Sequence, residues 1–246
     1  MADPLLTVTG LFKSFGALMA ACDLDLEVAE GEVHALIGPN GAGKTTFLCQ
    51  LSGEVKPDRG IIRFNRRNIQ DLPVYKRVRL GLARSYQITS IFPMLSTEDN
   101  VAMAVQARSG HSFRFIKPAR EDLSLRKPAK EILALVDLDT RANVPASSLS
   151  HGEQRQLELA MALAPSPRML LLDEPMAGMS SDEVARLSDL LAGLRGRVTI
   201  LLVEHDMDVV FALSDLITVL IFGRRVITGE PAEIRASDEV RAAYLG

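Results

Sequence analysis

A glycine-rich segment at residues 38–45 constrains this chain more than any other feature of its sequence. It reads Gly-Pro-Asn-Gly-Ala-Gly-Lys-Thr, which matches the G-x-x-x-x-G-K-[ST] pattern of phosphate-binding loops. An apolar, strand-like stretch at 33–37 precedes it, and a helix-compatible stretch at 46–51 follows it, with Gly53 where that helix should end. A strand, a glycine-rich loop and a helix in this order predict a nucleotide-binding α/β domain.

The loop predicts a site for the phosphates of a nucleotide. Glycines let successive backbone N–H groups point at phosphate oxygens, and the helix that starts here adds its positive end. Lys44 can reach the β- and γ-phosphates, and the Thr45 hydroxyl is placed to bind Mg²⁺. The residues expected to bind these phosphates are Gly38, Pro39, Asn40, Gly41, Ala42, Gly43, Lys44, Thr45 and Thr46.

Composition predicts a soluble globular protein of the cytoplasm. Of the 246 residues, 47% are hydrophobic and 24% are charged, and the net charge of −3 argues against a nucleic-acid-binding surface. No apolar stretch approaches the ~20 residues that cross a bilayer, and no export signal is visible at the start. Two cysteines, Cys22 and Cys49, provide no disulfide framework.

The order of apolar runs predicts an α/β core with a helical insertion. Short apolar runs at 169–172 and 198–203 suit buried strands of a parallel sheet. From about residue 94 to 147 the pattern changes to helices with polar, basic connections. The expected division is a single domain, 1–246, with its core in 1–88 and 148–246 and a helical subdomain in 89–147.

The stretch 109–130 is rich in arginine and lysine around two prolines. We expect it to be a solvated, mobile connection between the helices at 97–107 and 129–136. Contact with anionic lipid head groups is the alternative interpretation.

The apolar run at 169–172 ends in two carboxylates, Asp173 and Glu174. A phosphate-loop ATPase needs one acid near Mg²⁺ and a second group to orient the attacking water. Asp173 suits the first role, through a metal-bound water, and Glu174 suits the second, as general base. A polar strand end at the surface is the alternative, which the phosphate loop disfavours. His205 follows the run at 198–203, and open α/β sheets bind phosphates at such carboxyl ends.

Ser150 and Glu153 have the spacing of a capping box ahead of a periodic helix at 155–163. One interpretation is that these residues only start the helix. The other is that Ser150 and Gly152, exposed at a helix start, bind phosphate held by another subunit. Periodicity does not decide between them.

Five ordered motifs together resemble an ABC-transporter ATP-binding subunit. They are the phosphate loop, Gln87, Leu149–Gln154, Leu170–Pro175 and Glu204–Asp206, and the match covers essentially the whole chain. The resemblance implies a P-loop NTPase (RecA-like) core with an antiparallel β-subdomain and an inserted helical subdomain. It also implies ATP and Mg²⁺ as ligands, and ATP hydrolysis coupled to transport.

The same resemblance implies roles for individual residues. Two subunits sandwich two ATP molecules head to tail, so that Ser150 and Gly152 act in trans. Phe15 stacks on adenine, and Gln87 binds Mg²⁺ and senses the membrane partner. The implied metal-binding residues are Thr45, Gln87 and Asp173, and the implied catalytic residues are Glu174 and His205.

Finer features resemble importers of branched-chain amino acids. They are Asp173–Met179, residues 84–100 and the ending at 243–246, and the chain resembles the longer of the two ATPases that these importers pair. Importers of urea and related amides share much of this, and so do lipopolysaccharide-export ATPases. Two departures from the family pattern are His151, where glycine is common, and Ser180, where many cassettes carry aspartate.

The resemblance also implies partners and a location. The partners are a second ABC ATPase in a homo- or heterodimer, two transmembrane permease subunits and a periplasmic or extracellular solute-binding protein, with no nucleic acid. The location is the cytoplasmic face of the inner membrane, as a peripheral subunit. Near Gln87, the side chains of Ile91, Phe92, Met94 and Leu95 predict a groove for a short helix of a membrane subunit, with local core packing as the alternative.

Three functions follow from these features. The first is the energising subunit of an importer of branched-chain amino acids or related small polar solutes. The second is an export ATPase for a lipid or polysaccharide. The third is a non-transport ABC ATPase, a class that typically has two fused cassettes or long coiled coils, and this chain shows neither.

Overall fold

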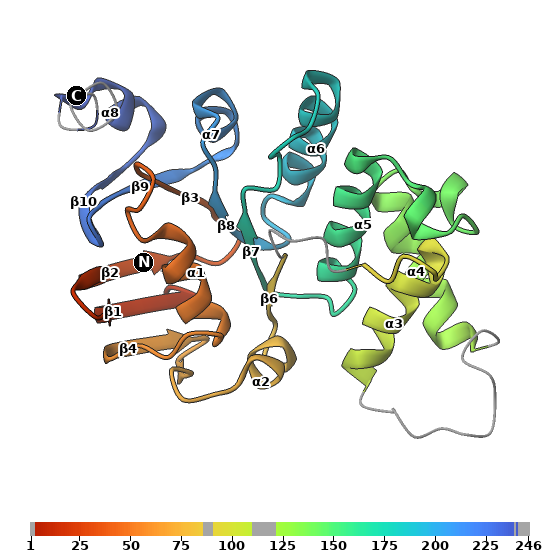
Figure 1. The fold of residues 1–246 in the computed structure, drawn as a ribbon, viewed down its shortest axis with the longest axis horizontal. Helices are drawn as coiled ribbons and strands as arrows, with labels where there is room; N and C mark the ends of the chain where they lie inside the picture. The colour runs from red at the N-terminus through yellow and green to blue at the C-terminus, as the bar shows by residue number, and fades with distance from the viewer. Residues whose placement is uncertain (1–2, 86–90, 110–121, 239, 241–246) are drawn as a thin grey trace.

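The computed structural model describes residues 3–85, 91–109, 122–238 and 240, and within them the strands form two sheets (Figure 1). One sheet is antiparallel, with the order β2 (Leu18–Val28), β1 (Leu6–Phe15), β4 (Arg59–Phe64) and β5 (Arg67–Asn68). The other has the order β10 (Arg224–Gly229), β9 (Leu216–Ile221), β3 (Val33–Ile37), β8 (Thr199–Val203), β7 (Met169–Asp173) and β6 (Leu82–Arg84). Its strands are parallel except for β10.

Helices lie against both sheets and form a group of their own at one end of the molecule (Figure 1). They are α1 (Lys44–Ser52), α2 (Val74–Arg79), α3 (Thr97–Ser109), α4 (Leu123–Leu135), α5 (His151–Leu163), α6 (Ser181–Leu194), α7 (Met207–Leu213) and α8 (Pro231–Ala236), with 3₁₀ turns η2 (Asp139–Arg141) and η3 (Ala146–Ser148). No helix in the described part of the chain is long and apolar enough to span a membrane.

The central strands of the six-stranded sheet, β3, β7 and β8, are buried on both faces, as their apolar runs predicted. In β7, Met169 and Leu171 belong to the same buried cluster as α1, whereas Leu170 and Leu172 belong to the cluster on the other face, with α5 and α6. A strand covered on both sides has no solvent-facing positions, which is why it reads as a continuous apolar run. Helix α1 itself lies between the two sheets, because its buried Phe47 packs with residues from both. The predicted P-loop NTPase fold is confirmed.

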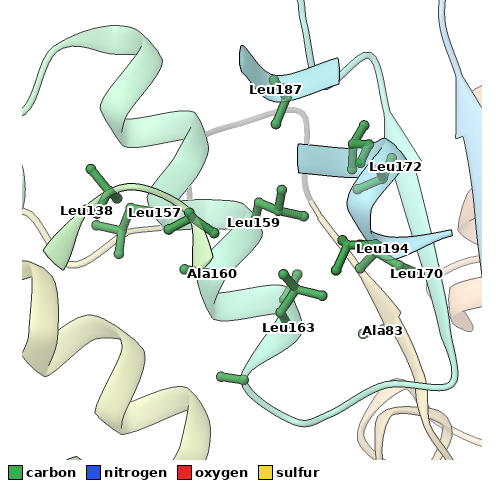
Figure 2. Packing of buried hydrophobic residues seen from close by; sticks show 14 of the residues in the cluster. Ala83, Leu138, Leu157, Leu159, Ala160, Leu163, Leu170, Leu172, Leu187 and Leu194 are labelled. Carbon is green, nitrogen blue, oxygen red and sulfur yellow. The ribbon is translucent and has the colours of Figure 1, made fainter. Parts of the chain in front are cut away.

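Helix α5 connects the helical group to the sheet (Figure 2). Leu159 and Leu163 point toward Leu170 of β7, while Leu157 on the other side of the helix points toward Leu138. These residues belong to one continuous buried cluster, which also contains Val101 of α3. The helical group therefore shares its core with the sheet, and the division of the domain at residues 88/89 and 147/148 stays a proposal.

Helix α4 begins inside the stretch 109–130, which the sequence predicted to be a solvated connection. That prediction is wrong from the start of α4 onward. Arg126 reaches back to α3 and pairs with Asp99 at 2.6 Å, and both side chains are mostly buried. This contact and the burial of one helix face outweigh the cost of Pro128 inside the helix. The remainder, 110–121, lies outside the described residues.

The helix that follows the phosphate loop ends on a buried arginine. Gly53 caps α1 in the left-handed conformation, as the sequence predicted, and a Cβ there would lie 2.7 Å from Arg77 Nε. The Arg77 guanidinium donates to four backbone carbonyls, those of Gln50, Leu51, Gln70 and Leu72. Two of these belong to the last turn of α1, whose carbonyls have no partner within the helix. Burial lowers the pKa of Arg77 to about 10, so it is still charged at neutral pH.

We predict that Arg77→Met lowers the free energy of unfolding by about 3 kcal/mol, because it leaves buried carbonyls without a donor. Arg77→Lys should lose about half of that, since an ammonium cannot reproduce the planar fork of donors. Arg79 is exposed and lies in the same helix as Arg77, α2. Arg79→Met should therefore change the free energy of unfolding by less than about 0.5 kcal/mol. Urea unfolding of the three variants measures this, and equal losses for Arg77→Met and Arg79→Met would contradict it.

Candidate functional site

A cavity of about 220 Å³ opens beside the phosphate loop. Its lining consists of Phe15, Leu18, Ala20, Asn40, Gly41, Ala42, Gly43, Lys44, Thr45, Thr46 and Glu174. Phe15, at the end of β1, is about half exposed, and Leu18, at the start of β2, is two-thirds exposed. The β1–β2 turn therefore presents apolar surface next to a polar loop, which suits a ligand with a flat apolar part and a charged part.

The loop needs its glycines for reasons visible in the structure. Gly43 has φ 99°, in the left-handed region, and a Cβ on it would lie 2.1 Å from the carbonyl oxygen of Ala20. A Cβ on Gly38 would lie 2.1 Å from the carbonyl oxygen of Leu220. Any side chain at either position would push the loop away from its neighbours. The backbone curve that could cradle phosphates therefore depends on close backbone contacts.

Lys44 lies inside the curve of the loop. Its ammonium donates to the carbonyl oxygens of Gly38 (2.7 Å) and Pro39 (3.1 Å). Burial lowers the pKa of Lys44, and the carboxylates of Glu174 and Asp173 oppose that shift. A buried cation beside a nucleotide-sized cavity is the arrangement expected of a group that binds phosphate.

Three parallel strands bring the charged groups to the loop. β8 pairs with β3 on one side and with β7 on the other, and Val203 of β8 is the register partner of Asp173. The side chain of Asp173 is fully buried, and its Oδ1 lies 3.4 Å from Thr45 Oγ1. Burial raises the pKa of Asp173, and the guanidinium of Arg84 opposes that shift.

Glu174 and His205 contact each other directly. Glu174 Oε1 lies 2.6 Å from His205 Nε2, so the two residues share a short hydrogen bond. Glu174 has φ 51°, in the left-handed region, and its N–H donates to the carbonyl of Val203, which turns the carboxylate out of the strand. When the Glu174 carboxylate is ionised it can only accept, and this hydrogen bond then needs the proton on His205 Nε2.

The residues present fit a magnesium nucleotide. A hydroxyl and a carboxylate oxygen 3.4 Å apart, on Thr45 and Asp173, are ligands of the type that Mg²⁺ uses. Among the described residues, no group of three or more His, Cys, Asp or Glu could hold a metal ion. A magnesium ion here would therefore depend on phosphate oxygens and water for most of its coordination.

Two of the predicted site residues, Ser150 and Gly152, lie apart from the phosphate loop. Ser150 and Gly152 line a separate cavity of about 290 Å³ at the start of α5. The predicted capping box is confirmed, since Ser150 Oγ accepts from the N–H of Glu153 and the Glu153 side chain accepts from the N–H of Ser150. Gln87 lies outside the described residues.

Sequence reasoning assigned no role to two charged residues of this site. Glu204 is buried, and its two oxygens accept the N–H groups of Met176 (2.9 Å) and His205 (3.0 Å), which fastens the loop after β7 to the end of β8. Arg84 is buried against Asp173. The signal for Glu204 was its place directly after a buried strand, whereas no local pattern marks Arg84.

Comparisons with known proteins agree with this geometry. The ABC transporter family model matches residues 22–177. The branched-chain amino acid transport ATP-binding protein LivG of Salmonella typhimurium is 40% identical over 100% of this chain and 99% of its own length. The lipopolysaccharide export ATP-binding protein LptB of Acidithiobacillus ferridurans is 35% identical over 98% of this chain and 97% of its own length.

The solved structures agree at the level of the fold. A nucleotide-free ATP-binding cassette from an ABC transporter superposes with a TM-score of 0.88, covers 99% of both chains and is 23% identical. Its low identity shows the fold alone, but the family model covers more than half of the chain, and LivG and LptB match it almost from end to end. This chain belongs to the ATP-binding subunits of the ABC transporter family.

Proposed function

We propose that this chain is the ATP-hydrolysing subunit of an importer for branched-chain amino acids or related small polar solutes such as urea and amides. The observation that carries the proposal is the 40% identity with LivG over the full length of both proteins. Export of a lipid or polysaccharide is the second candidate, because LptB is 35% identical over nearly as much of the chain. A non-transport role has no comparable support.

In the proposed reaction, a water oxygen attacks the γ-phosphorus of ATP, and the bond from that phosphorus to the β–γ bridging oxygen breaks, giving ADP and phosphate. Glu174 orients the water and accepts its proton, and the hydrogen bond from His205 fixes the carboxylate. Lys44 and the loop N–H groups hold the phosphates, while Phe15 stacks on the adenine. Thr45, Gln87 and, through a water, Asp173 would hold Mg²⁺, which would neutralise charge on the phosphates.

The proposed active unit is a dimer of ATPase subunits, identical or different. Ser150 and Gly152 then complete the site of the facing subunit, which agrees with their position in a cavity apart from the phosphate loop. The proposal also assigns this chain two permease subunits and a solute-binding protein, and places it at the cytoplasmic face of the inner membrane.

Exposed apolar side chains support a permease contact after β6. Phe92 and Met94 are 46% and 87% exposed, whereas Ile91 is half-buried against the core shared with the helical group. Asn100 of α3 holds this segment in place, since its side chain bonds to the backbone N–H and C=O of Phe92. Phe92 and Met94 are the side chains we assign to docking.

The transported solute is tested with the reconstituted complex. The chain is combined with the membrane subunits and solute-binding protein with which it co-purifies, and ATPase activity is measured with leucine, urea and short amides. Stimulation by one of these solutes is the expected result. A complex that contains no solute-binding protein and does not respond to any of them would favour export.

We predict that Glu174→Gln keeps ATP binding but lowers turnover by about 10²–10⁴-fold, because the amide cannot accept the proton from water. Lys44→Ala, in contrast, should lose ATP binding itself, since the loop loses its buried cation. Binding of a fluorescent ATP analogue and phosphate release, measured on the same preparations, separate the two effects. Rapid turnover by Glu174→Gln would remove this residue from its role.

We predict that Gly43→Ala weakens ATP binding by at least about tenfold, since strain of this kind costs ~1–3 kcal/mol and the new Cβ meets the Ala20 carbonyl. Gly193→Ala is the matched control, because Gly193 lies in α6 and a Cβ there meets nothing within 4 Å. Titration with a fluorescent ATP analogue measures both, with thermal unfolding to show that each variant is folded. Unchanged affinity in Gly43→Ala would mean that the loop tolerates displacement.

A further inference from the structure

Arg84 forms a buried ion pair with the carboxylate proposed to face the metal. Its Nη2 lies 2.9 Å from Asp173 Oδ2, and the side chains are 6% and 0% exposed. Neither side chain reaches bulk water to any extent, so the two charges compensate each other inside the protein. Arg84 is the last residue of β6, which pairs in parallel with β7, and this pairing sets the distance between the two residues.

The two oxygens of Asp173 have different partners. Oδ2 accepts from Arg84, while Oδ1 faces the hydroxyl of Thr45 at 3.4 Å. A carboxylate held at one oxygen by a guanidinium cannot rotate freely, so its other oxygen stays directed toward Thr45. The ion pair thus sets the direction of the carboxylate as well as its charge.

Arg84 is itself anchored at the far end of α1. Its Nη1 lies 3.2 Å from Glu54 Oε2 and 3.1 Å from Cys49 Sγ. Glu54 in turn accepts a hydrogen bond from the Ser52 hydroxyl at 2.9 Å. One guanidinium therefore connects β6, the end of β7 and the C-terminal end of the helix that starts at the phosphate loop. Only a planar fork of donors can bond in these directions at once.

We propose that Arg84 is a positioning residue for hydrolysis, which holds the Asp173 carboxylate in the orientation that the magnesium nucleotide requires. The inference rests on the proposed function, because it gives Asp173 its role there. Arg84 is not among the residues that line the cavity beside the phosphate loop, so in this proposal it acts on hydrolysis through Asp173. A purely structural ion pair would affect stability alone, so the two roles differ in what they do to catalysis.

The first test is kinetic. Arg84→Met should lower kcat of the magnesium-dependent ATPase by about 10–100-fold and raise the Mg²⁺ concentration needed for half-maximal rate, as is typical when a residue behind a metal ligand is lost. The KM for ATP, and the binding of a fluorescent ATP analogue in EDTA, should stay within about threefold, because Lys44 and the loop are unchanged. Arg84→Lys should restore part of kcat, since it returns the charge.

The matched control is Arg168→Met. Arg168 also pairs with a carboxylate, that of Glu30 at 2.7 Å, but both side chains are well exposed. The Arg168→Met variant should leave kcat and the Mg²⁺ requirement unchanged. The proposal would be overturned if Arg84→Met had the same kcat and Mg²⁺ requirement as Arg168→Met. It would also be overturned if Arg84→Lys and Arg84→Met lost kcat equally.

The second test needs no catalysis. Thermal unfolding in EDTA is measured for the wild type, Arg84→Met, Asp173→Asn and the double variant. Arg84→Met should lower Tm by about 4 °C or more when Asp173 is present, because it leaves a buried carboxylate without its partner. In the Asp173→Asn background the loss should be clearly smaller, because no carboxylate is left there to lose its partner. Equal losses in both backgrounds would show that Arg84 does not act on Asp173.

The outcomes separate this proposal from the function on which it rests. A wild-type protein that hydrolyses ATP, with an equally active Arg84→Met, would overturn the role of Arg84 alone. A wild-type protein that neither binds nor hydrolyses ATP with Mg²⁺, alone or with its membrane partners, would overturn both.

Discussion

The parallel pairing of β3, β8 and β7 is the constraint on which the candidate site depends. The phosphate loop follows β3, Glu174 follows β7, and His205 comes two residues after the end of β8. Because Asp173 and Val203 are register partners, the residues after them emerge at the same level. A slip of one residue in β7 would turn Asp173 to the opposite face of the sheet and separate it from Thr45.

That pairing also explains why so many charges can be buried near the loop. Lys44, Asp173 and Glu204 are each less than one-tenth exposed, and each has partners at hydrogen-bond distance. A buried charge without a partner costs several kcal/mol, so the positions of these groups depend on one another. The result is a site whose acids and bases are held in place by protein contacts.

Much of this arrangement could be predicted from the sequence, because local rules govern it. The glycine-rich loop has its own pattern, the buried strands appear as apolar runs, and Ser150 starts α5 with the capping box that its spacing indicated. Asp173 and His205 could both be placed near the phosphate loop, because each lies at the carboxyl end of a strand and parallel strands end at one edge of a sheet.

What could not be predicted depends on residues far apart in the chain. The start of α4 has a local cap, because the Asp122 side chain accepts from the N–H of Ser124, but its packing depends on Arg126 meeting Asp99. A basic stretch with prolines carries no sign of that distant partner. Arg84 meets Asp173 across 89 positions of sequence, through the pairing of β6 with β7. Neither contact leaves a periodic pattern, because each involves a single side chain and a fold-dependent neighbour.

The start of α5 shows how local folding and the proposed function can require the same residues. A Cβ on Gly152 would lie 2.1 Å from Glu183 Oε1, so a larger residue there would displace the Glu183 side chain, which accepts from Ser180 at the start of α6. Ser150 caps the helix through its hydroxyl and is exposed at the same time. A helix start that is capped by a small residue and kept free of bulk presents the positive end of its dipole, which favours a phosphate. The contacts that fold α5 therefore also leave an accessible surface suited to the nucleotide of a facing subunit.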